Sequence, residues 1–342
     1  MRLRAQPFTK SAGEDNTIFS ADLPRHLESW LMAGDISQHS ERTITTRRER
    51  LGKLAWFLTY KELEQCGLPE LRQFFQYLNH GHKEPGGRWG NPRCTKPVSS
   101  GNVKSYHSSM RTFFNWLVDE GVISHSPMIR LAVPVDRPDQ VAPFSTDQLV
   151  AIIETAKKSP INPTRELAIV LLLLDTGIRV SELCAANRSD IDFQSGQMVV
   201  RHGKGDKMRT VFFSRDTKRA LHAYFNNVVL IFDNGEPEPL FVAERGHETS
   251  GRLTRSGVDK IIRRICLAAG VTGVRCSPHT FRHTMAVSFI RNGGSGFSLK
   301  ELLGHSSIFM TNRYVALASV DLAAQHQRFS PVANLKMNGK KG

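Results

Sequence analysis

The stretch "LAIVLLLLDTGIRVSEL", residues 167–183, joins an apolar run to a turn and a short polar segment. The run 167–174 is too short to cross a bilayer, which takes about 20 residues, so it predicts a helix buried in a protein core. Gly177 is expected to end this helix, and Arg179 and Glu182 then fall three residues apart on the next one. On its own, such a pair is typical of a solvated helix surface, where it is worth little.

The sequence around this stretch is mostly helical in pattern, with one β-hairpin. Two β-rich runs in "GQMVVRHGKGDKMRTVFF" (196–213) are joined by a glycine-containing turn, near whose tip lie Lys204 and Lys207. Ser145 and Gln148 have the spacing of a capping box, so a domain begins near residue 144. Further helices are predicted at 215–228, 254–269, 278–292, 298–304 and 307–317. The fold class is therefore mainly α with a small β-hairpin, an α+β arrangement.

The first third of the chain predicts a separate helical domain. Apolar residues at helical spacing predict helices at 23–34, 41–58, 68–79 and 101–121. The connection 80–100 is rich in Gly, Pro and basic residues, which predicts a long mobile loop. The segment 124–144 is rich in proline and reads as an extended linker. We therefore expect a tail at 1–20, a helical domain at 21–123, a linker at 124–144, a second domain at 145–330 and a basic tail at 331–342.

The net charge indicates the class of binding partner, and the cysteine content indicates the cellular compartment. Lys and Arg number 46 against 32 Asp and Glu, a net charge of +14, which favours polyanions and above all nucleic acid. A generally basic protein with no such partner is the plainer alternative. Five cysteines with no CxxC pair make a disulfide framework or zinc ribbon unlikely, and a reducing cytosol fits. With no apolar signal region at the start, a cytoplasmic protein with no membrane partner is expected.

The segment "SPHTFRHT" (277–284) places His279, Arg282 and His283 on one face of a predicted helix, with Phe281 and Met285 facing the opposite way into a core. The two histidines could hold zinc, but no glutamate follows the first as in H-E-x-x-H, and a cation stands between them. Binding of a negatively charged group such as a phosphate would also explain Arg282, which the metal interpretation leaves without a role. Downstream, "LLGHSSIFMTNRYV" (302–315) contains a histidine and a tyrosine, either of which alone would more often be a packing residue.

Taken in order, these residues resemble the catalytic set of the tyrosine recombinase (phage integrase) family, including Xer-type resolvases and transposon integrases. The family's order is Arg, Lys, His-x-x-Arg, His or Trp, then Tyr, and the matching residues here are Arg179, Lys204, His279, Arg282, His305 and Tyr314. The words "TGIRVSEL" and "HTFRHT" are also family-like, and the resemblance covers essentially the whole chain. It implies a DNA-binding core-binding domain at 21–123 and a catalytic domain at 145–330.

The resemblance also implies a mechanism. The enzyme would cleave and rejoin duplex DNA at specific recombination sites through a 3′-phosphotyrosine on Tyr314 and a Holliday junction, with no metal, ATP or other cofactor. Lys204 would be the general acid, with Lys207 as the alternative. Glu182 and His283 would support the site.

Four protomers on DNA are implied, and an accessory DNA-bending protein is an option. Basic residues on two N-terminal helices are the expected DNA contacts: Arg47, Arg48, Lys53, Lys104 and Arg111. The C-terminal piece 319–335 would dock onto a neighbouring protomer or pack on its own chain. A type IB topoisomerase shares the catalytic set and is the main alternative, and a non-catalytic DNA-binding factor is the other.

Overall fold

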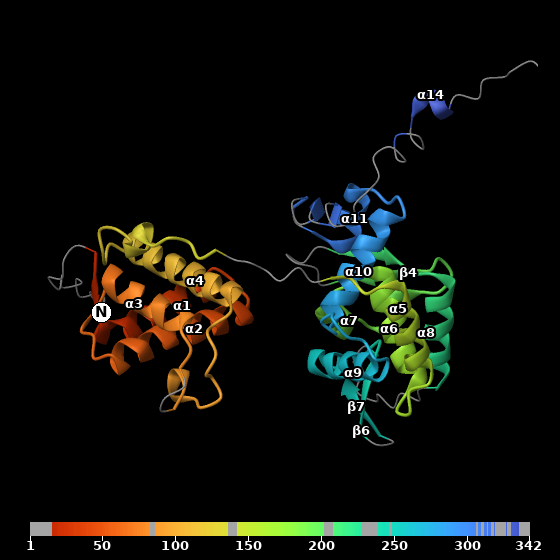
Figure 1. Ribbon diagram of the computed structural model, residues 1–342, viewed down its shortest axis with the longest axis horizontal. Helices are drawn as coiled ribbons and strands as arrows, with labels where there is room; N and C mark the ends of the chain where they lie inside the picture. The colour runs from red at the N-terminus through yellow and green to blue at the C-terminus, as the bar shows by residue number, and fades with distance from the viewer. Residues whose placement is uncertain are drawn as a thin grey trace, which may run out of the picture. The chain divides into compact units, whose positions relative to one another are not determined.

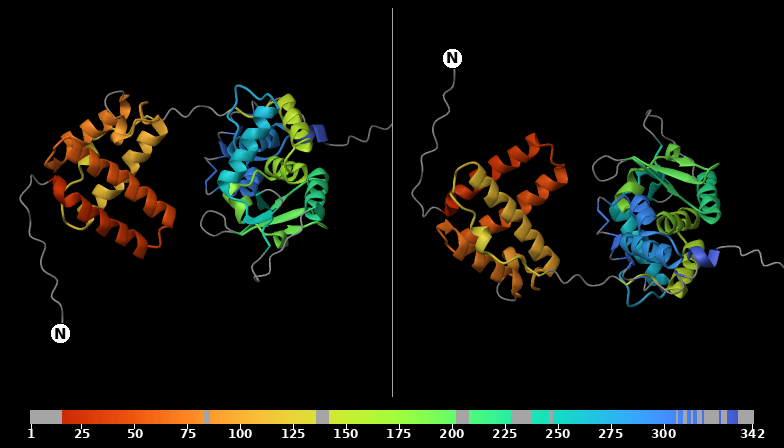
Figure 2. Two further views of the ribbon diagram at one scale, coloured as in Figure 1. Left: turned by 90° about the horizontal axis from the view of Figure 1, so that it is seen from below. Right: turned by 90° about the horizontal axis from the view of Figure 1, so that it is seen from above.

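The computed structural model describes residues 16–82, 86–135, 142–201, 208–227, 238–245 and 248–305, and beyond them only 307–308, 311–312, 314–315, 318, 326 and 330–334. The chain forms two compact units, residues 1–139 and 140–342, drawn in Figures 1 and 2. The fold is mostly helical with small sheets, as predicted. None of the helices in the described part of the chain is long and apolar enough to cross a bilayer.

The first unit is a helical bundle with its own core. Its helices are α1 (Leu23–Ile36), α2 (Glu41–Tyr60), α3 (Leu68–Asn79) and α4 (Ser100–Asp119), with the short 3-10 turns η1 (Ser20–Asp22), η2 (Arg88–Gly90) and η3 (Pro127–Arg130). A small antiparallel pair, β1 (Ile18–Phe19) with β2 (Gln65–Cys66), ties the start of the unit to the approach to α3. Large aromatic side chains fill the core, among them Phe57, Phe74 and Phe113. The four predicted helices agree with these bounds to within two residues.

Two segments of the first unit are more closely packed than their composition suggests. The loop 80–100 was expected to be mobile, but Trp89 packs its ring against Trp56 and Tyr77 at 5.5 and 5.4 Å between centroids. Met128, in the segment expected to form the linker, is buried against the first unit's core. Composition could not reveal either contact, because both depend on tertiary partners.

The second unit is built around α6 (Pro163–Thr176), the helix expected from the apolar run. Ala168, Ile169, Val170, Leu172 and Leu173 of α6 are fully buried, and α5, α8 and α10 pack around it. The other helices are α5 (Thr146–Lys157), α7 (Val180–Ala185), α8 (Arg215–Asn227), α9 (Arg255–Ala268), α10 (Pro278–Arg291), α11 (Gly296–Leu303) and α14 (Pro331–Asn334), with η4 (Arg188–Asp190). The capping box predicted at the start of α5 is present, because Ser145 Oγ accepts from the backbone N–H of Gln148 and Gln148 Oε1 accepts from that of Ser145.

The predicted hairpin lies in a three-stranded antiparallel sheet. Its strands are β3 (Ile191–Asp192), β4 (Gln197–Val200) and β5 (Arg209–Phe212), in the order β3-β4-β5. Val200 pairs with Arg209 across β4 and β5, so both strands lead into the segment 202–207. A second pair, β6 (Val242–Arg245) and β7 (Glu248–Arg252), is separate. All five cysteines are free; Cys266 is buried and Cys184 is half-buried.

Candidate active site

Arg179 and Glu182 are joined at the start of α7 and are not a solvated surface pair. Gly177 ends α6 in the left-handed conformation (φ 60°), and Arg179 then caps α7. The Glu182 carboxylate, only 2% exposed, accepts from both the backbone N–H and Nη1 of Arg179, each at 2.8 Å. The resulting arrangement fixes the Arg179 side chain, which is 25% exposed, at the surface of the unit.

Arg209 on β5 completes this cluster, although no motif in the sequence singled it out. Its Nη1 and Nη2 donate to the two carboxylate oxygens of Glu182 at 2.9 and 2.7 Å. Burial alone would raise the pKa of Glu182, but the hydrogen bonds from Arg209 and Arg179 outweigh burial and hold that pKa below its ordinary value. The only signal was a charged residue within a β-rich run, which is also common on an exposed strand.

Arg282 lies on α10 and is 4% exposed. Its Nη1 donates to the carbonyl of Gly177 at 2.6 Å and its Nη2 to that of Leu303 at 2.8 Å. Burial, with the nearby charge of Arg179, lowers the pKa of Arg282 to about 10. The side chain is therefore still charged at neutral pH.

Three arginines from three elements meet the end of α11. The carbonyls of Leu302, Leu303 and Gly304 accept in turn from Arg209 Nε at 2.9 Å, Arg282 Nη2 at 2.8 Å and Arg179 Nη2 at 3.3 Å. The last carbonyls of a helix have no partner within it and carry the negative end of its dipole, so cations are favourable there. The arrangement gathers positive charge immediately before His305.

Tyr314 lies beside two histidines. Its side chain is 6% exposed, with the His283 ring 5.2 Å and the His305 ring 6.1 Å away between centroids. His305 is itself oriented by a 2.9 Å hydrogen bond between its Nδ1 and Thr311 Oγ1. Tyr314 is also close enough to Arg282 for its charge to act on the guanidinium. The described part of the site therefore brings together a phenol, two imidazoles and the buried guanidinium of Arg282.

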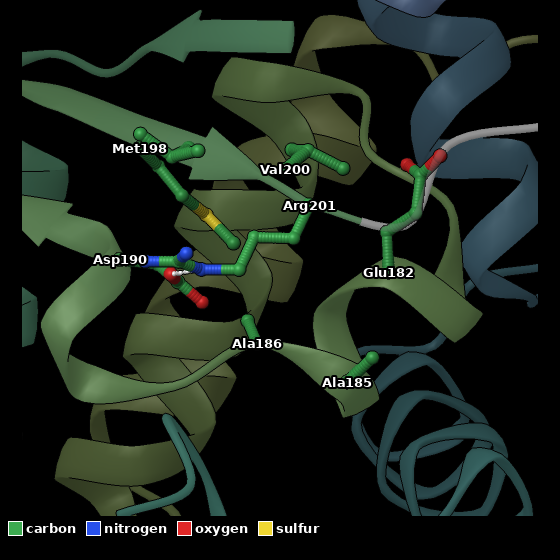
Figure 3. Close-up of a pocket in the computed structure, with 8 residues that line it drawn as sticks. Glu182, Ala185, Ala186, Asp190, Met198, Val200 and Arg201 are labelled. Carbon is green, nitrogen blue, oxygen red and sulfur yellow. Dashed lines mark hydrogen bonds and ion pairs between the residues drawn. The ribbon is translucent and has the colours of Figure 1, made fainter. Parts of the chain in front are cut away.

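The other two residues predicted to be catalytic are His279 and Lys204. His279 is exposed on the first turn of α10. Lys204 and the alternative Lys207 lie outside the described residues, between β4 and β5. Just before them, Arg201 forms an ion pair with the buried carboxylate of Asp190. Figure 3 shows this pair in a small recess with Met198, while Glu182 at its edge points away from it.

The prediction for α10 was wrong in one respect. Phe281 and Met285 do pack into the core, but the face expected to be free is also buried, because Arg282 and His283 are each 4% exposed. The residues 280–287 are all buried, so this stretch of α10 is enclosed on every side, and the exposed residues of the helix, His279 and Arg291, lie near its two ends. Within the described residues, no three His, Cys, Asp or Glu side chains gather as they would to hold a metal ion.

The expected DNA contacts on the first unit fall into two groups. Arg47 lies over the Trp30 ring at 4.5 Å and is hydrogen-bonded to His39 Nδ1, and Arg48 pairs with Glu28. Lys53 lies over the Trp89 ring, and Lys104 and Arg111 are exposed on α4. The C-terminal segment 319–335 falls largely outside the described residues.

Comparison with known proteins agrees with this geometry. The family model described as "Phage integrase family" matches residues 143–320. A tyrosine recombinase XerD of Oceanobacillus iheyensis is 33% identical over 240 residues, 69% of this chain and 77% of that protein. A tyrosine recombinase XerC of Anoxybacillus flavithermus is 31% identical over 284 residues, 81% of this chain and 87% of that protein.

Solved structures share the fold. The Tn1549 transposon integrase in complex with a circular intermediate DNA has a TM-score of 0.70 at 18% identity, covering 90% of this chain and 98% of that one. The XerH site-specific recombinase bound to a palindromic difH substrate, a post-cleavage complex, has a TM-score of 0.65 at 17% identity, covering 92% and 84%. The family model spans more than half of the chain, and the relatives exceed 30% identity over most of their length. The chain therefore belongs to the phage integrase family, the tyrosine recombinases.

Proposed function

We propose that this protein is a site-specific recombinase that cuts and rejoins duplex DNA through a covalent 3′-phosphotyrosine on Tyr314. The observation that carries the proposal is the meeting of Arg179, Arg282, His305 and Tyr314 at the end of α11, in a chain of the tyrosine recombinase family. The recombinases and integrases named above support this reading, and none of them favours a topoisomerase.

Arg179 and Arg282 stabilise charge on the scissile phosphate. A phosphodiester under attack gains charge on its non-bridging oxygens, and a guanidinium meets two such oxygens with parallel N–H donors. Each guanidinium has five N–H donors, and the backbone and Glu182 contacts described above use two on each side chain. The remaining donors are held in place before DNA arrives, so little reorganisation is needed in the transition state.

Tyr314 is the nucleophile. Its phenol oxygen attacks phosphorus, the bond from phosphorus to the 5′-oxygen breaks, and the tyrosine becomes esterified to the 3′-phosphate. A phenol of ordinary pKa is only about 0.1% ionised at neutral pH, so its proton must be taken up. We assign that role to His279, with His283 and His305 orienting the phenol and the phosphate, and Glu182 orienting Arg179.

The leaving 5′-oxygen takes a proton from Lys204, on the segment between β4 and β5. In the reverse reaction, a 5′-hydroxyl of another duplex attacks the 3′-phosphotyrosine, joins the exchanged strands and returns the proton. The reaction therefore needs no ATP or metal. Two rounds of exchange pass through a Holliday junction. We infer that four protomers assemble on paired sites, with the segment 319–335 reaching a neighbouring protomer.

The first unit is assigned to hold the duplex. The five expected contacts, Arg47, Arg48, Lys53, Lys104 and Arg111, would bind phosphates of the duplex; Arg47 and Arg48 also contact His39 and Glu28. Such contacts fix the position of the protein on DNA without reading sequence.

The test is covalent capture. Incubated with a nicked suicide substrate carrying the flanking repeats of its own locus, the wild-type chain should give a shifted band on a denaturing gel, and Tyr314→Phe should give none. Tyr60→Phe is the matched control, because Tyr60 is an exposed tyrosine of the first unit. A covalent band from Tyr314→Phe would show that another residue is the nucleophile.

A further inference from the structure

The loop between α3 and α4 contains a buried cation with no visible counter-charge. Arg88 is 7% exposed, and its Nε is enclosed with no hydrogen-bond partner. Among the residues that the structure describes, no carboxylate lies within ion-pair distance of Arg88. A buried charge left in this state is costly, because nothing replaces the water it has lost. The position therefore requires an explanation other than stability.

The loop backbone is built to hold Arg88 where it is. Trp89, the next residue, adopts the left-handed conformation (φ 64°, ψ 24°), which costs a side-chain-bearing residue roughly 1–2 kcal/mol. Tyr77 stabilises it, since the Tyr77 hydroxyl accepts from the Trp89 N–H at 3.3 Å. On the other side, Gly87 (φ 68°) admits no side chain, because a Cβ there would lie 2.1 Å from the Asn91 carbonyl oxygen. Strain kept in this way is characteristic of binding sites.

Two more cations converge on the same aromatic cluster. The Lys53 ammonium lies 5.3 Å from the Trp89 ring, and the Arg50 guanidinium lies 6.0 Å from the Tyr106 ring. Arg50 is held there by hydrogen bonds to the Ser105 carbonyl and Ser109 Oγ on α4, at 3.2 and 2.9 Å.

The charges of Arg50 and Arg88 act on a common side chain. Burial raises the pKa of Tyr106, and the charges of Arg50 and then Arg88 oppose that rise, so both cations are near it. Glu49 acts on Tyr106 in the opposite sense, but within the described residues no ion pair joins Glu49 to either arginine. The cluster therefore has a local excess of positive charge.

We infer that Arg88, with Lys53 and Arg50, forms a binding site for a phosphate group of the DNA backbone. The inference rests on the proposed function, which supplies duplex DNA as the partner, and it names the place on the first unit where a phosphate is held. A phosphate supplies the anion that the cluster lacks, and its oxygens suit the planar donors of an arginine. The Trp89 and Tyr106 rings hold Lys53 and Arg50 in place before binding.

The experiment is a salt titration of DNA binding by the full chain. The probe is a fluorescein-labelled duplex of random sequence, because phosphate contacts carry no sequence information. Arg88→Gln should weaken binding about tenfold at moderate salt, the range for a hydrogen bond to a charged group. It should also make the slope of log affinity against log salt shallower by about one. Arg88→Lys keeps the charge and should restore most of the slope. If the role of Arg88 were purely structural, neither Arg88→Gln nor Arg88→Lys would change this slope.

The matched control is Arg25→Gln, which removes the same charge from an exposed arginine of α1 that pairs with Asp22 and should leave the slope unchanged. Lys53→Gln gives an independent result, because Lys53 is only partly buried and its loss should not affect folding. An unchanged slope in Lys53→Gln overturns the site even if Arg88→Gln fails to fold by circular dichroism. Competition by sodium phosphate, beyond that of chloride at equal ionic strength, would indicate a site for a free anion and overturn the assignment to DNA. The covalent band of the wild type tests the recombinase proposal separately.

Discussion

Arg209 makes three side-chain hydrogen bonds in the site, whereas the side chains of Arg179 and Arg282 make two each. It bonds both oxygens of Glu182 and the carbonyl of Leu302, so it connects β5, α7 and the end of α11. Glu182 in turn fixes Arg179. Arg209 therefore acts on the phosphate through its neighbours, as a positioning residue.

Arg209→Lys tests this role. Lysine keeps the charge but cannot bond both carboxylate oxygens and a carbonyl at once, so Glu182 and Arg179 should be less well aimed. We expect single-turnover formation of the covalent band at saturating DNA to slow roughly 10–100-fold, the scale of a small misplacement in an active site, with little change in DNA affinity. Arg219→Lys is the control, an exposed arginine of α8 paired with Asp216. Equal rates for the two variants would contradict the role.

The assignment of the general acid to Lys204 depends on the proton needed by the leaving oxygen. Protonation of such a group typically contributes 10²–10⁴-fold, and a 5′-bridging phosphorothiolate leaves as a thiolate without it. Lys204→Ala should therefore cripple cleavage of ordinary DNA yet cleave the phosphorothiolate substrate almost as fast as the wild type. Arg282→Ala should fail on both, because it stabilises phosphate charge. If only Lys207→Ala is rescued by sulfur, the role belongs to Lys207.

Helices and the hairpin were predictable from local sequence, but the environment of the site was not. The apolar run 167–174, Gly177 and the capping box at Ser145 each act within a few residues, and each has the expected structure. The burial of Arg282 depends on carbonyls of Gly177 and Leu303, which are distant in sequence. The polar segment "HTFRHT" therefore predicted a solvent-exposed helix face, whereas in the structure His279 is exposed and Arg282 and His283 are buried. Arg209 was missed for the same reason, because its partners come from α7 and α11.

The end of α11 offers a test of how closely the arginines are fitted to it. Gly304 ends the helix in the left-handed conformation (φ 62°), and a Cβ there would lie 3.1 Å from Cδ and Nη1 of Arg209. Gly304→Ala should lower stability by about 1 kcal/mol through backbone strain and should also displace Arg209 and slow cleavage.

Gly270→Ala is the control for strain alone. Gly270 has a similar backbone (φ 68°) after α9, but nothing lies within 4 Å of the position of its Cβ. Thermal melts should show a similar loss of stability in both variants, and only Gly304→Ala should lose activity in the suicide-substrate assay. Full activity of Gly304→Ala would mean that the Arg209 position is not critical.

The chain contains two separate cores, which makes the division of labour between its units testable. The first core is rich in aromatic side chains from α1 to α4, and the second surrounds α6 and includes residues from α5 to α10. Each unit is of ordinary domain size and buries its own apolar residues, which is what an independently folding unit needs. Every described residue of the proposed catalytic set, from Arg179 to Tyr314, lies in the second unit, whereas the Arg88 site lies in the first.

Expression of residues 1–139 and 140–342 as separate fragments should therefore separate binding from chemistry. Each fragment should unfold cooperatively in a thermal melt, because the core of each is complete without the other. The fragment 140–342 should still form the covalent band with a suicide substrate, but only at higher protein concentration, because it has lost the phosphate contacts of the first unit. The fragment 1–139 should bind duplex DNA with a clear salt dependence and form no covalent band, and Arg88→Gln within it should reduce the salt slope as in the full chain.

Mixing the fragments should not restore the full chain's affinity, since the covalent connection supplies the effective concentration that makes two weak contacts act together. DNA affinity of 140–342 equal to that of the full chain would mean that the first unit contributes no binding energy. The proposed role of the first unit in holding the duplex and the Arg88 site would then both fail, while the assignment of Tyr314 would stand.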